Sequence, residues 1–268
     1  MRRACRTALP VLASAGAALF AVARADAGAP PAGDTTSIRE YRTGHAFALA
    51  KPNAQLLLGA NTRCMLGWCK LAIARAYAFG LYADEAALRA AAAREPGAPS
   101  RAAALLDAVE AGAGSASLVL VIARAIDGEH LAHGFGTSVR ARHRALLAAR
   151  GAPPPAPAAA AQLAALCAGF SGESMKVGDE VELAWARGVL SLSINGRRVP
   201  RADITDAALA RALFNVYAGD EPAPVSKRAR DTFERNLASL ATAPAPPGAD
   251  FKGAVAATVL AEHATRVK

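Results

Sequence analysis

The chain has 268 residues, of which 53% are hydrophobic and 5% aromatic, and its formal net charge is +9 at neutral pH. This length is enough for one domain with a sizeable core. Its basic residues form no run of five or more and its aromatic residues are few, which argues against a nucleic-acid-binding surface.

Residues 1–26 predict a targeting leader. They have arginines at positions 2, 3 and 6, continue with an apolar run from Ala8 to Ala23, and end in small residues around "ARADA". This pattern fits import into an organelle, either mitochondrion or plastid, and it also fits a secretory signal. The apolar run is shorter than the ~20 residues of a usual membrane span. We expect organelle import with this run as a candidate membrane anchor, and the secretory route stays open as an alternative.

Residues 27–52 are rich in Gly, Pro, Thr and charge, which predicts a linker. The folded domain is expected over residues 53–241. Within it, residues 59–84 ("GANTRCMLGWCKLAIARAYAFGLYAD") read as a long apolar strand with Arg63 near its start. Asp84 then predicts the cap of a helix in "DEAALRAAAA".

The middle of the chain alternates between helices and a strand. "EPGAPS" ends the first helix, and "RAAALLDAVEA" predicts a second one. "SLVLVIARAI" predicts a buried strand, because it is a continuous apolar run rich in β-branched residues. "EHLAHGFGTSVRARHRALLAA" predicts a helix, and the proline-rich "GAPPPAPAAA" predicts a surface loop.

The last part predicts a hairpin and helices. "DEVELAWARGVLSLSINGRRVP" alternates as strands do and turns at Asn195 and Gly196. "TDAALARALFNVYAGDEP" predicts a capped helix ending at Gly219 in a left-handed conformation, and "PVSKRARDTFERNLASL" an amphipathic helix. Residues 242–268 predict a C-terminal tail with a fragment of helix. Strands in hairpins with helices between them indicate an α+β fold.

Cysteines and histidines give no clear site. Cys5, Cys64, Cys69 and Cys167 lack metal-ligand spacing, so we expect free thiols and no metal site. No established catalytic signature is present, so no catalytic residue is assigned.

His130 and His133 lie three residues apart on a predicted helix. They read as a solvated or capping pair rather than as ligands of a metal or a haem, because the sequence suggests no third ligand.

Arg63 and Tyr77 form the sharpest candidate site. An arginine beside an apolar strand is either a surface residue with a buried stem, or a guanidinium aimed into a pocket, where its planar donors fit a carboxylate. Tyr77, fourteen residues further on, reaches the same anion only if the chain turns back, which Gly67 would permit.

Four stretches together resemble the chalcone isomerase-like family, over about residues 55–240. They are "GANTR", "YAFGLYAD", "VGDEVELAW" with "GVLSLSINGR", and "LFNVYAGDEPAP", in this order. The resemblance implies an open-faced β-sandwich of the α+β class, in which helices cover a large antiparallel sheet and leave a cleft. The family includes plant enzymes that close a chalcone to a flavanone. It also includes relatives without that activity, among them plastid fatty-acid-binding proteins and mitochondrial membrane-associated proteins, some of which bind haem.

The resemblance also assigns residues. The strand arginine of the enzymes corresponds to Arg63, and their strand threonine to Tyr77, as in the fatty-acid-binding relatives. Their helical tyrosine and asparagine, seven residues apart, have no counterpart in "EHLAHGFGTSVRARHRALL". Their pocket threonine or serine falls at Val216, beside Tyr217. Only the arginine of the catalytic set is retained, which implies a protein that is not an enzyme.

We therefore predict a non-catalytic protein that binds a fatty acid or a similar amphipathic carboxylate. Arg63 would pair with the carboxylate, Tyr77 would donate to it, and Arg124 would be a second contact. The apolar faces of "LAIA" and "LVLVIA" would line the tail. One alternative is an intramolecular lyase, an isomerase with Arg63 and Tyr77 as electrophilic groups. The other is a haem-binding, membrane-associated mitochondrial protein with His130 or His133 as axial ligand; otherwise no cofactor is expected.

Overall fold

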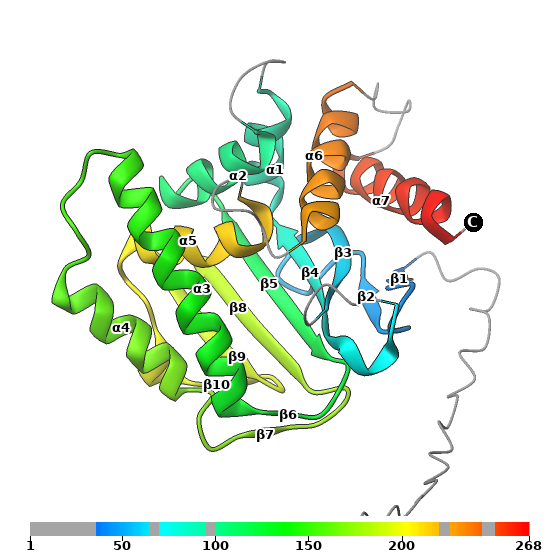
Figure 1. Ribbon diagram of the computed structural model, residues 1–268. Helices are drawn as coiled ribbons and strands as arrows, with labels where there is room; N and C mark the ends of the chain where they lie inside the picture. Colours follow the sequence, from blue (N-terminus) through cyan, green and yellow to red (C-terminus); the bar gives the residue numbers. More distant parts are fainter. Residues whose placement is uncertain (1–35, 65–69, 95–99, 220–225, 243–249, 268) are drawn as a thin grey trace, which may run out of the picture. The chain divides into compact units, whose positions relative to one another are not determined.

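The computed structural model describes residues 36–64, 70–94, 100–219, 226–242 and 250–267 (Figure 1). The chain divides into two units, Met1–Gly33 and Asp34–Lys268, and the described residues all belong to the second. The predicted leader therefore lies outside them. No helix in the described part of the chain is long and apolar enough to cross a bilayer.

A six-stranded antiparallel sheet organises the second unit, with the strand order β10-β9-β8-β5-β4-β3 (Figure 1). In β8 the side chains of Val181, Leu183 and Trp185 are buried and their neighbours are more exposed, which is the period-two alternation of a strand with one face on a core. The strands of this sheet are β3 Leu56–Cys64, β4 Arg75–Ala83, β5 Ser115–Ile122, β8 Glu180–Ala186, β9 Val189–Ile194 and β10 Arg197–Arg198.

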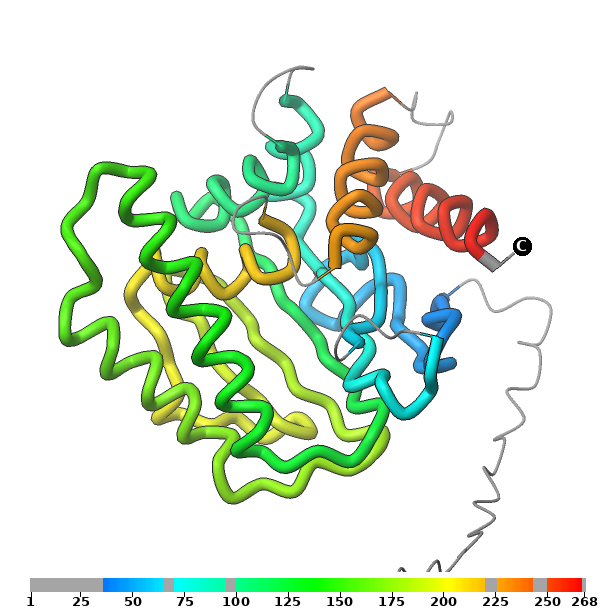
Figure 2. The backbone as a smooth tube through the Cα atoms, in the orientation of Figure 1, coloured from blue at the N-terminus to red at the C-terminus, as the bar shows by residue number. Residues whose placement is uncertain are grey.

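Helices cover one face of this sheet, and α3 runs across it beside α5 (Figure 2). The indole ring of Trp185 packs against Phe214 of α5 with ring centroids 5.7 Å apart, which joins the sheet to the helical layer. The prediction of an α+β fold with a large antiparallel sheet covered by helices is confirmed. The helices are α1 Glu85–Ala92, α2 Arg101–Glu110, α3 Gly128–Ala149, α4 Pro157–Ala168, α5 Ala207–Ala218, α6 Lys227–Thr242 and α7 Phe251–Val267.

The prediction of one long strand over residues 59–84 is wrong. This stretch holds most of β3 and all of β4, two antiparallel strands, with the short 3-10 helix η2 (Ala72–Ala74) just before β4. Eight of the nine residues of β4 are buried, so its apolar run has no polar alternation that would reveal where one strand ends and the next begins.

Local signals located several element ends correctly. The Asp84 carboxylate accepts from the amide of Ala87 at 3.0 Å, so the predicted cap of α1 is confirmed. The turn at Asn195 and Gly196 is also confirmed, since both residues have positive φ, 50° and 74°. Gly219, in contrast, is extended at φ −81° and ψ 166°, so the predicted left-handed end of α5 is wrong.

The expected loop over residues 151–160 also needs correction, because α4 starts within it at Pro157. A proline suits the first helical position, where its missing N–H would have no partner in any case.

The expected linker over residues 27–52 has to be corrected. β1 (Ser37–Arg39) and β2 (Ala46–Ala48) pair as a small antiparallel sheet, and the side chains of Ile38, Phe47 and Leu49 are buried. Phe47 packs onto β4 at Gly80, where an added Cβ would lie 2.8 Å from its ring. These strands have only three residues each, too few for a periodic pattern to show.

The expected tail over residues 242–268 is corrected in the same way. Helix α7 packs against α6 and β3, and Val255 and Val259, one helical turn apart, are buried.

A second two-stranded sheet, β6 (Ile126–Asp127) with β7 (Ser174–Met175), lies beside the start of α3. The 3-10 helix η3 (Pro200–Ala202) follows β10.

Candidate ligand-binding site

A cavity of about 120 Å³ lies where β3 ends and β4 begins, between these strands and the helices α3 and α5. Residues from β3, β4, β6, α3 and α5 line it. The lining residues are Arg63, Ala76, Tyr77, Ile126, His130, Leu131, Gly134, Phe135, Ser138, Val216 and Tyr217.

The wall from α3 follows from helical spacing. His130, Gly134 and Ser138 recur every four residues and so share one face of the helix. Asp127 starts the helix, since its carboxylate accepts from the amide of Glu129 at 3.0 Å. A Cβ added at Gly134 would meet no atom within 4 Å, so there is open space beside this part of α3. The sequence contained this periodicity, but the prediction did not use it to assign a cavity wall.

Arg63 and Tyr77 are direct partners across β3 and β4. Residues opposite each other in an antiparallel pair project from the same face of the sheet. The structure therefore brings the two side chains together, as required by the hypothesis of a chain that turns back between them.

The hydroxyl groups of Tyr77 and Tyr217 lie 2.8 Å apart and form a hydrogen bond in which either can donate. Burial is the largest cause that raises the pKa of Tyr77 above its ordinary value, and Tyr217 and Arg63 partly oppose it. Burial also raises the pKa of Tyr217, with Tyr77 adding to the effect and Arg63 and Arg142 opposing it. Both phenols are therefore neutral. Because each has one proton and the mutual bond uses one, one proton stays available to an acceptor in the cavity.

A second arginine, Arg142, acts electrostatically on Tyr217 of this hydrogen-bonded pair. Arg142 lies one turn beyond Ser138 on α3, is buried, and donates to the carbonyls of Asn215 at 3.2 Å and Ser138 at 3.3 Å. Burial and the charge of Arg63 lower its pKa, while Tyr217 raises it. The charge of Arg142 is thus disfavoured by its burial and by the neighbouring guanidinium of Arg63. The sequence prediction missed Arg142, although it continues the four-residue spacing of the cavity face.

The predicted site residues fall into two groups. Arg63, Tyr77, Val216 and Tyr217 all line the cavity. Arg124 does not line it and donates instead to the carbonyl of Ile73 at 2.9 Å.

The expected lining by "LAIA" and "LVLVIA" is also corrected. Leu71 and Ile73 are exposed, and Leu118, Leu120 and Ile122 of β5 are buried in the core without lining the cavity. His130 lines it and His133 does not.

The cysteine prediction holds only in part. Cys64, next to Arg63, is disulfide-bonded, so the expectation of a free thiol is wrong for it. Cys167 is free, as predicted. Cys5 and Cys69 lie outside the described residues. Among the residues that the structure describes, no group of three or more His, Cys, Asp or Glu side chains is placed to hold a metal ion.

Comparisons with known proteins find similarity among solved structures. No family model and no curated protein sequence matches the chain. Among solved structures, a fatty-acid binding protein of Arabidopsis thaliana (AtFAP1) is similar, with a TM-score of 0.59 and 25% sequence identity. The match covers 77% of this chain and 100% of that protein. The fold is thus shared over the whole length of the Arabidopsis protein.

Proposed function

We propose that this protein, whose sequence resembles the chalcone isomerase-like family and whose fold is similar to that of a fatty-acid binding protein, binds a fatty acid or a similar amphipathic carboxylate in the cavity beside α3. One observation carries the proposal, namely that Arg63, Tyr77 and Tyr217 line the same cavity. The guanidinium presents parallel donors that match a carboxylate, and the phenol pair supplies one further donor.

The electrostatics of the cavity favour an anion over a neutral ligand. The phenols are held neutral by burial and add no competing negative charge. Arg63 disfavours the charge of Arg142, and a carboxylate between the strands and α3 would offset that effect. A buried carboxylate is tolerated where an ion pair and hydrogen bonds both satisfy it.

The cavity size limits how the ligand is held. Its volume of about 120 Å³ is below the ~300–1,000 Å³ that is usual for a drug-sized ligand. The carboxylate and the first carbons fit within it, and the rest of a long chain has to leave past Ile126 or displace Leu131 and Phe135. We therefore expect affinity to rise with chain length up to the cavity limit and to level off beyond it.

Calorimetric titration with a series of saturated fatty acids tests this function. Arg63→Ala is expected to weaken binding about 10- to 100-fold, because a charged hydrogen-bond pair contributes roughly 1.5–3 kcal/mol. Tyr77→Phe is expected to weaken it about fivefold. Arg124→Ala is the matched control and should leave affinity unchanged, since Arg124 does not line the cavity. Equal affinity of wild type and Arg63→Ala would show that the carboxylate is not held there.

A second function, intramolecular lyase activity, is favoured by one observation. Two neutral phenols beside an arginine form a donor set that can stabilise an oxygen on which negative charge develops. Turnover of a chalcone that Tyr77→Phe abolishes would establish the isomerase; no turnover would leave binding alone.

A haem is less well accommodated, because a porphyrin far exceeds the cavity beside His130. A Soret absorption band in purified protein would reverse that judgement.

For the compartment, the disulfide at Cys64 favours the secretory alternative over organelle import, because disulfides persist in oxidising compartments. Fractionation of cells that produce the tagged full chain distinguishes the two, and recovery from a mitochondrion or plastid would favour import.

A further inference from the structure

Three large apolar side chains are exposed in the part of the chain that the structure describes. They are Leu71 at 47%, Ile73 at 73% and Val177 at 62% relative exposure. Single exposed apolar residues are ordinary, but clustered ones mark an interaction surface.

The chain brings these three residues to one end of the sheet. Leu71 and Ile73 precede β4, and Val177 lies in the connection from β7 to β8. Both connections flank the end of β5 (Figure 1). Arg124 binds the carbonyl of Ile73 at 2.9 Å, and the amide of Gly178 donates to the carbonyl of Ile122 at 2.9 Å. The last residue of β5 is therefore in contact with one connection, and Arg124, two residues beyond it, with the other.

The ligand cavity is at this same end. Ala76 and Tyr77, which line it, follow directly after η2 and Arg75. The amide of Ala123 donates to the carbonyl of Ala76 at 3.1 Å, which joins the cavity wall to the chain after β5. The exposed apolar residues thus lie at the rim of the proposed binding site, and they are not spread over the surface.

In each connection an exposed lysine directly precedes an exposed apolar residue. Lys70 precedes Leu71, and Lys176 precedes Val177. Asp179, the carboxylate of the second connection, accepts from the amide of Lys176 at 2.6 Å and from the side chain of Asn195 at 3.1 Å, and Glu180 follows it at the start of β8. Asp127 and Glu129 lie further along, at the start of α3.

We propose that Lys70, Leu71, Ile73, Lys176 and Val177, here called the rim, dock on the surface of an anionic lipid bilayer. Apolar side chains that enter the interface, flanked by lysines that meet anionic headgroups, are the composition of interfacial membrane anchors. The choice of a bilayer rests in part on the proposed function, because a fatty acid partitions into membranes and its cavity borders the rim. Docking there shortens the path of the ligand from bilayer to cavity.

Vesicle binding by the full chain tests the rim. Vesicles of phosphatidylcholine mixed with phosphatidylglycerol are compared with phosphatidylcholine alone, by co-sedimentation and by hydrogen exchange. Leu71→Ser with Ile73→Ser is expected to weaken binding about tenfold or more, and Lys70→Gln with Lys176→Gln about tenfold for the anionic vesicles only. Lys227→Gln with Lys252→Gln removes two exposed lysines on α6 and α7, and this control should bind like wild type.

Hydrogen exchange locates the contact within the full chain. Protection of residues 70–75 and 174–179 on addition of anionic vesicles is expected. Protection confined to residues 1–26, or equal binding by rim variants and wild type, would overturn the docking surface. Protection of the rim without vesicles that grows with protein concentration would assign it to a second copy of the chain, and would also overturn the lipid proposal.

Arg63→Ala separates this proposal from the proposed function. It is expected to lose fatty-acid affinity and to keep vesicle binding, because Arg63 lines the cavity and is not part of the rim. Normal vesicle binding by rim variants combined with loss of fatty acid in Arg63→Ala would refute the docking surface alone. Weak vesicle binding by rim variants with full fatty-acid affinity in Arg63→Ala would refute the carboxylate site alone.

Discussion

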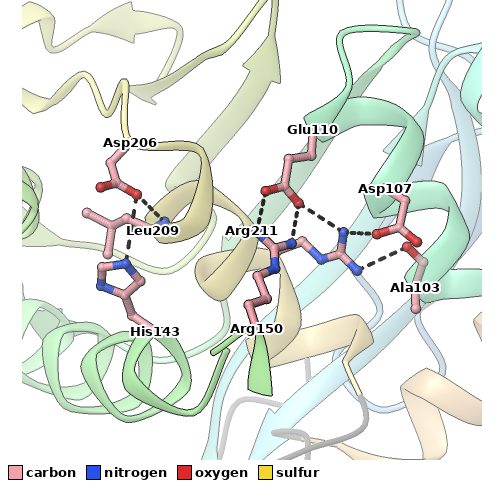
Figure 3. A network of polar contacts seen from close by, with 8 residues as sticks. All are labelled: Ala103, Asp107, Glu110, His143, Arg150, Asp206, Leu209 and Arg211. Carbon is pink, nitrogen blue, oxygen red and sulfur yellow. Dashed lines mark hydrogen bonds and ion pairs between the residues drawn. The ribbon is translucent and has the colours of Figure 1, made fainter. Parts of the chain in front are cut away.

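Two arginine clusters among the residues that the structure describes differ in how their charge is balanced. In the first, Arg211 of α5 lies 2.5 Å from a carboxylate oxygen of Asp107 and 3.2 Å from one of Glu110, both on α2 (Figure 3). Arg150 donates from both of its terminal nitrogens to the same Glu110 at 2.7 Å. Two arginines are matched there by two acids, so this cluster is complete without a ligand.

The second cluster lies at the cavity and behaves in the opposite way. The hydrogen bond to Glu110 is the largest cause that raises the pKa of Arg150, whereas burial and the charge of Arg63 lower the pKa of Arg142. The positive charge of Arg150 is thus favoured and that of Arg142 is disfavoured. The comparison indicates that the first cluster joins α2 to α5, and that the charge of Arg142 in the second cluster would be favoured by a nearby anion.

Removing one arginine from each cluster tests the difference between the two clusters most directly. Arg211→Met leaves Asp107 and Glu110 with too little positive charge, and we expect it to lower the free energy of unfolding by about 2–4 kcal/mol. Arg142→Met should cost about half of that or less, because it also removes the repulsion from Arg63. Urea denaturation measures both.

Ligand affinity is the second readout for the same two variants. Arg142→Met should weaken fatty-acid binding several-fold, while Arg211→Met should bind normally wherever it is folded. An equal loss of stability in both variants, with no change in affinity for Arg142→Met, would contradict the contrast between the clusters.

The extent to which the sequence predicts this site depends on how local each signal is. Capping at Asp84 and the Asn195–Gly196 turn involve neighbours in the chain, and both were predicted correctly. Arg63 and Tyr77 were assigned to one site, but only by assuming a turn between them. The exposure of Ile73 could not be predicted, since an apolar run looks the same whether it faces a core or solvent.

The helical wall of the cavity shows a signal that was present and went unused. His130, Gly134, Ser138 and Arg142 are spaced by four residues, so a shared helical face was readable from the sequence. The sequence did not predict which elements pack against this face, because α5 lies about eighty residues further along the chain.

A smaller effect on stability is expected from the hydrogen-bonded phenols of Tyr77 and Tyr217. Both phenols have a raised pKa, so in the folded protein they keep their protons above the ordinary tyrosine pKa of about 10, where the unfolded chain loses them. Stability from this pair is therefore fully present below about pH 10 and is lost as the pH rises further. Tyr217→Phe is expected to flatten this alkaline decline and to cost about 1 kcal/mol at neutral pH.

Unfolding measured between neutral and strongly alkaline pH checks the phenol pair. Tyr82, whose pKa is also raised by burial, is retained in the variant and serves as an internal reference for the remaining decline. An alkaline decline as steep in Tyr217→Phe as in wild type would show that the pair does not titrate as described.

The smallest expected effect concerns His143, which belongs to neither cluster. It is buried on α3, with Nε2 3.8 Å from the Asp206 carboxylate that caps α5 (Figure 3). Burial lowers its pKa, and Asp206 opposes this without reversing it. The unfolded chain therefore binds a proton more readily, so stability is present above the ordinary histidine pKa of about 6.5 and falls as the pH drops below it.

Two variants separate burial from the charge of Asp206. His143→Gln should remove the decline in unfolding free energy between about pH 6.5 and 5. Asp206→Asn keeps a good helix cap but removes the charge that raises the pKa of His143, so its titration by NMR should move to lower pH. A shift to higher pH in Asp206→Asn would mean that the carboxylate acts on the histidine in some other way than by its charge. In the wild-type protein, the capping of α5 by Asp206 and the effect of Asp206 on the pKa of His143 would then be independent of each other.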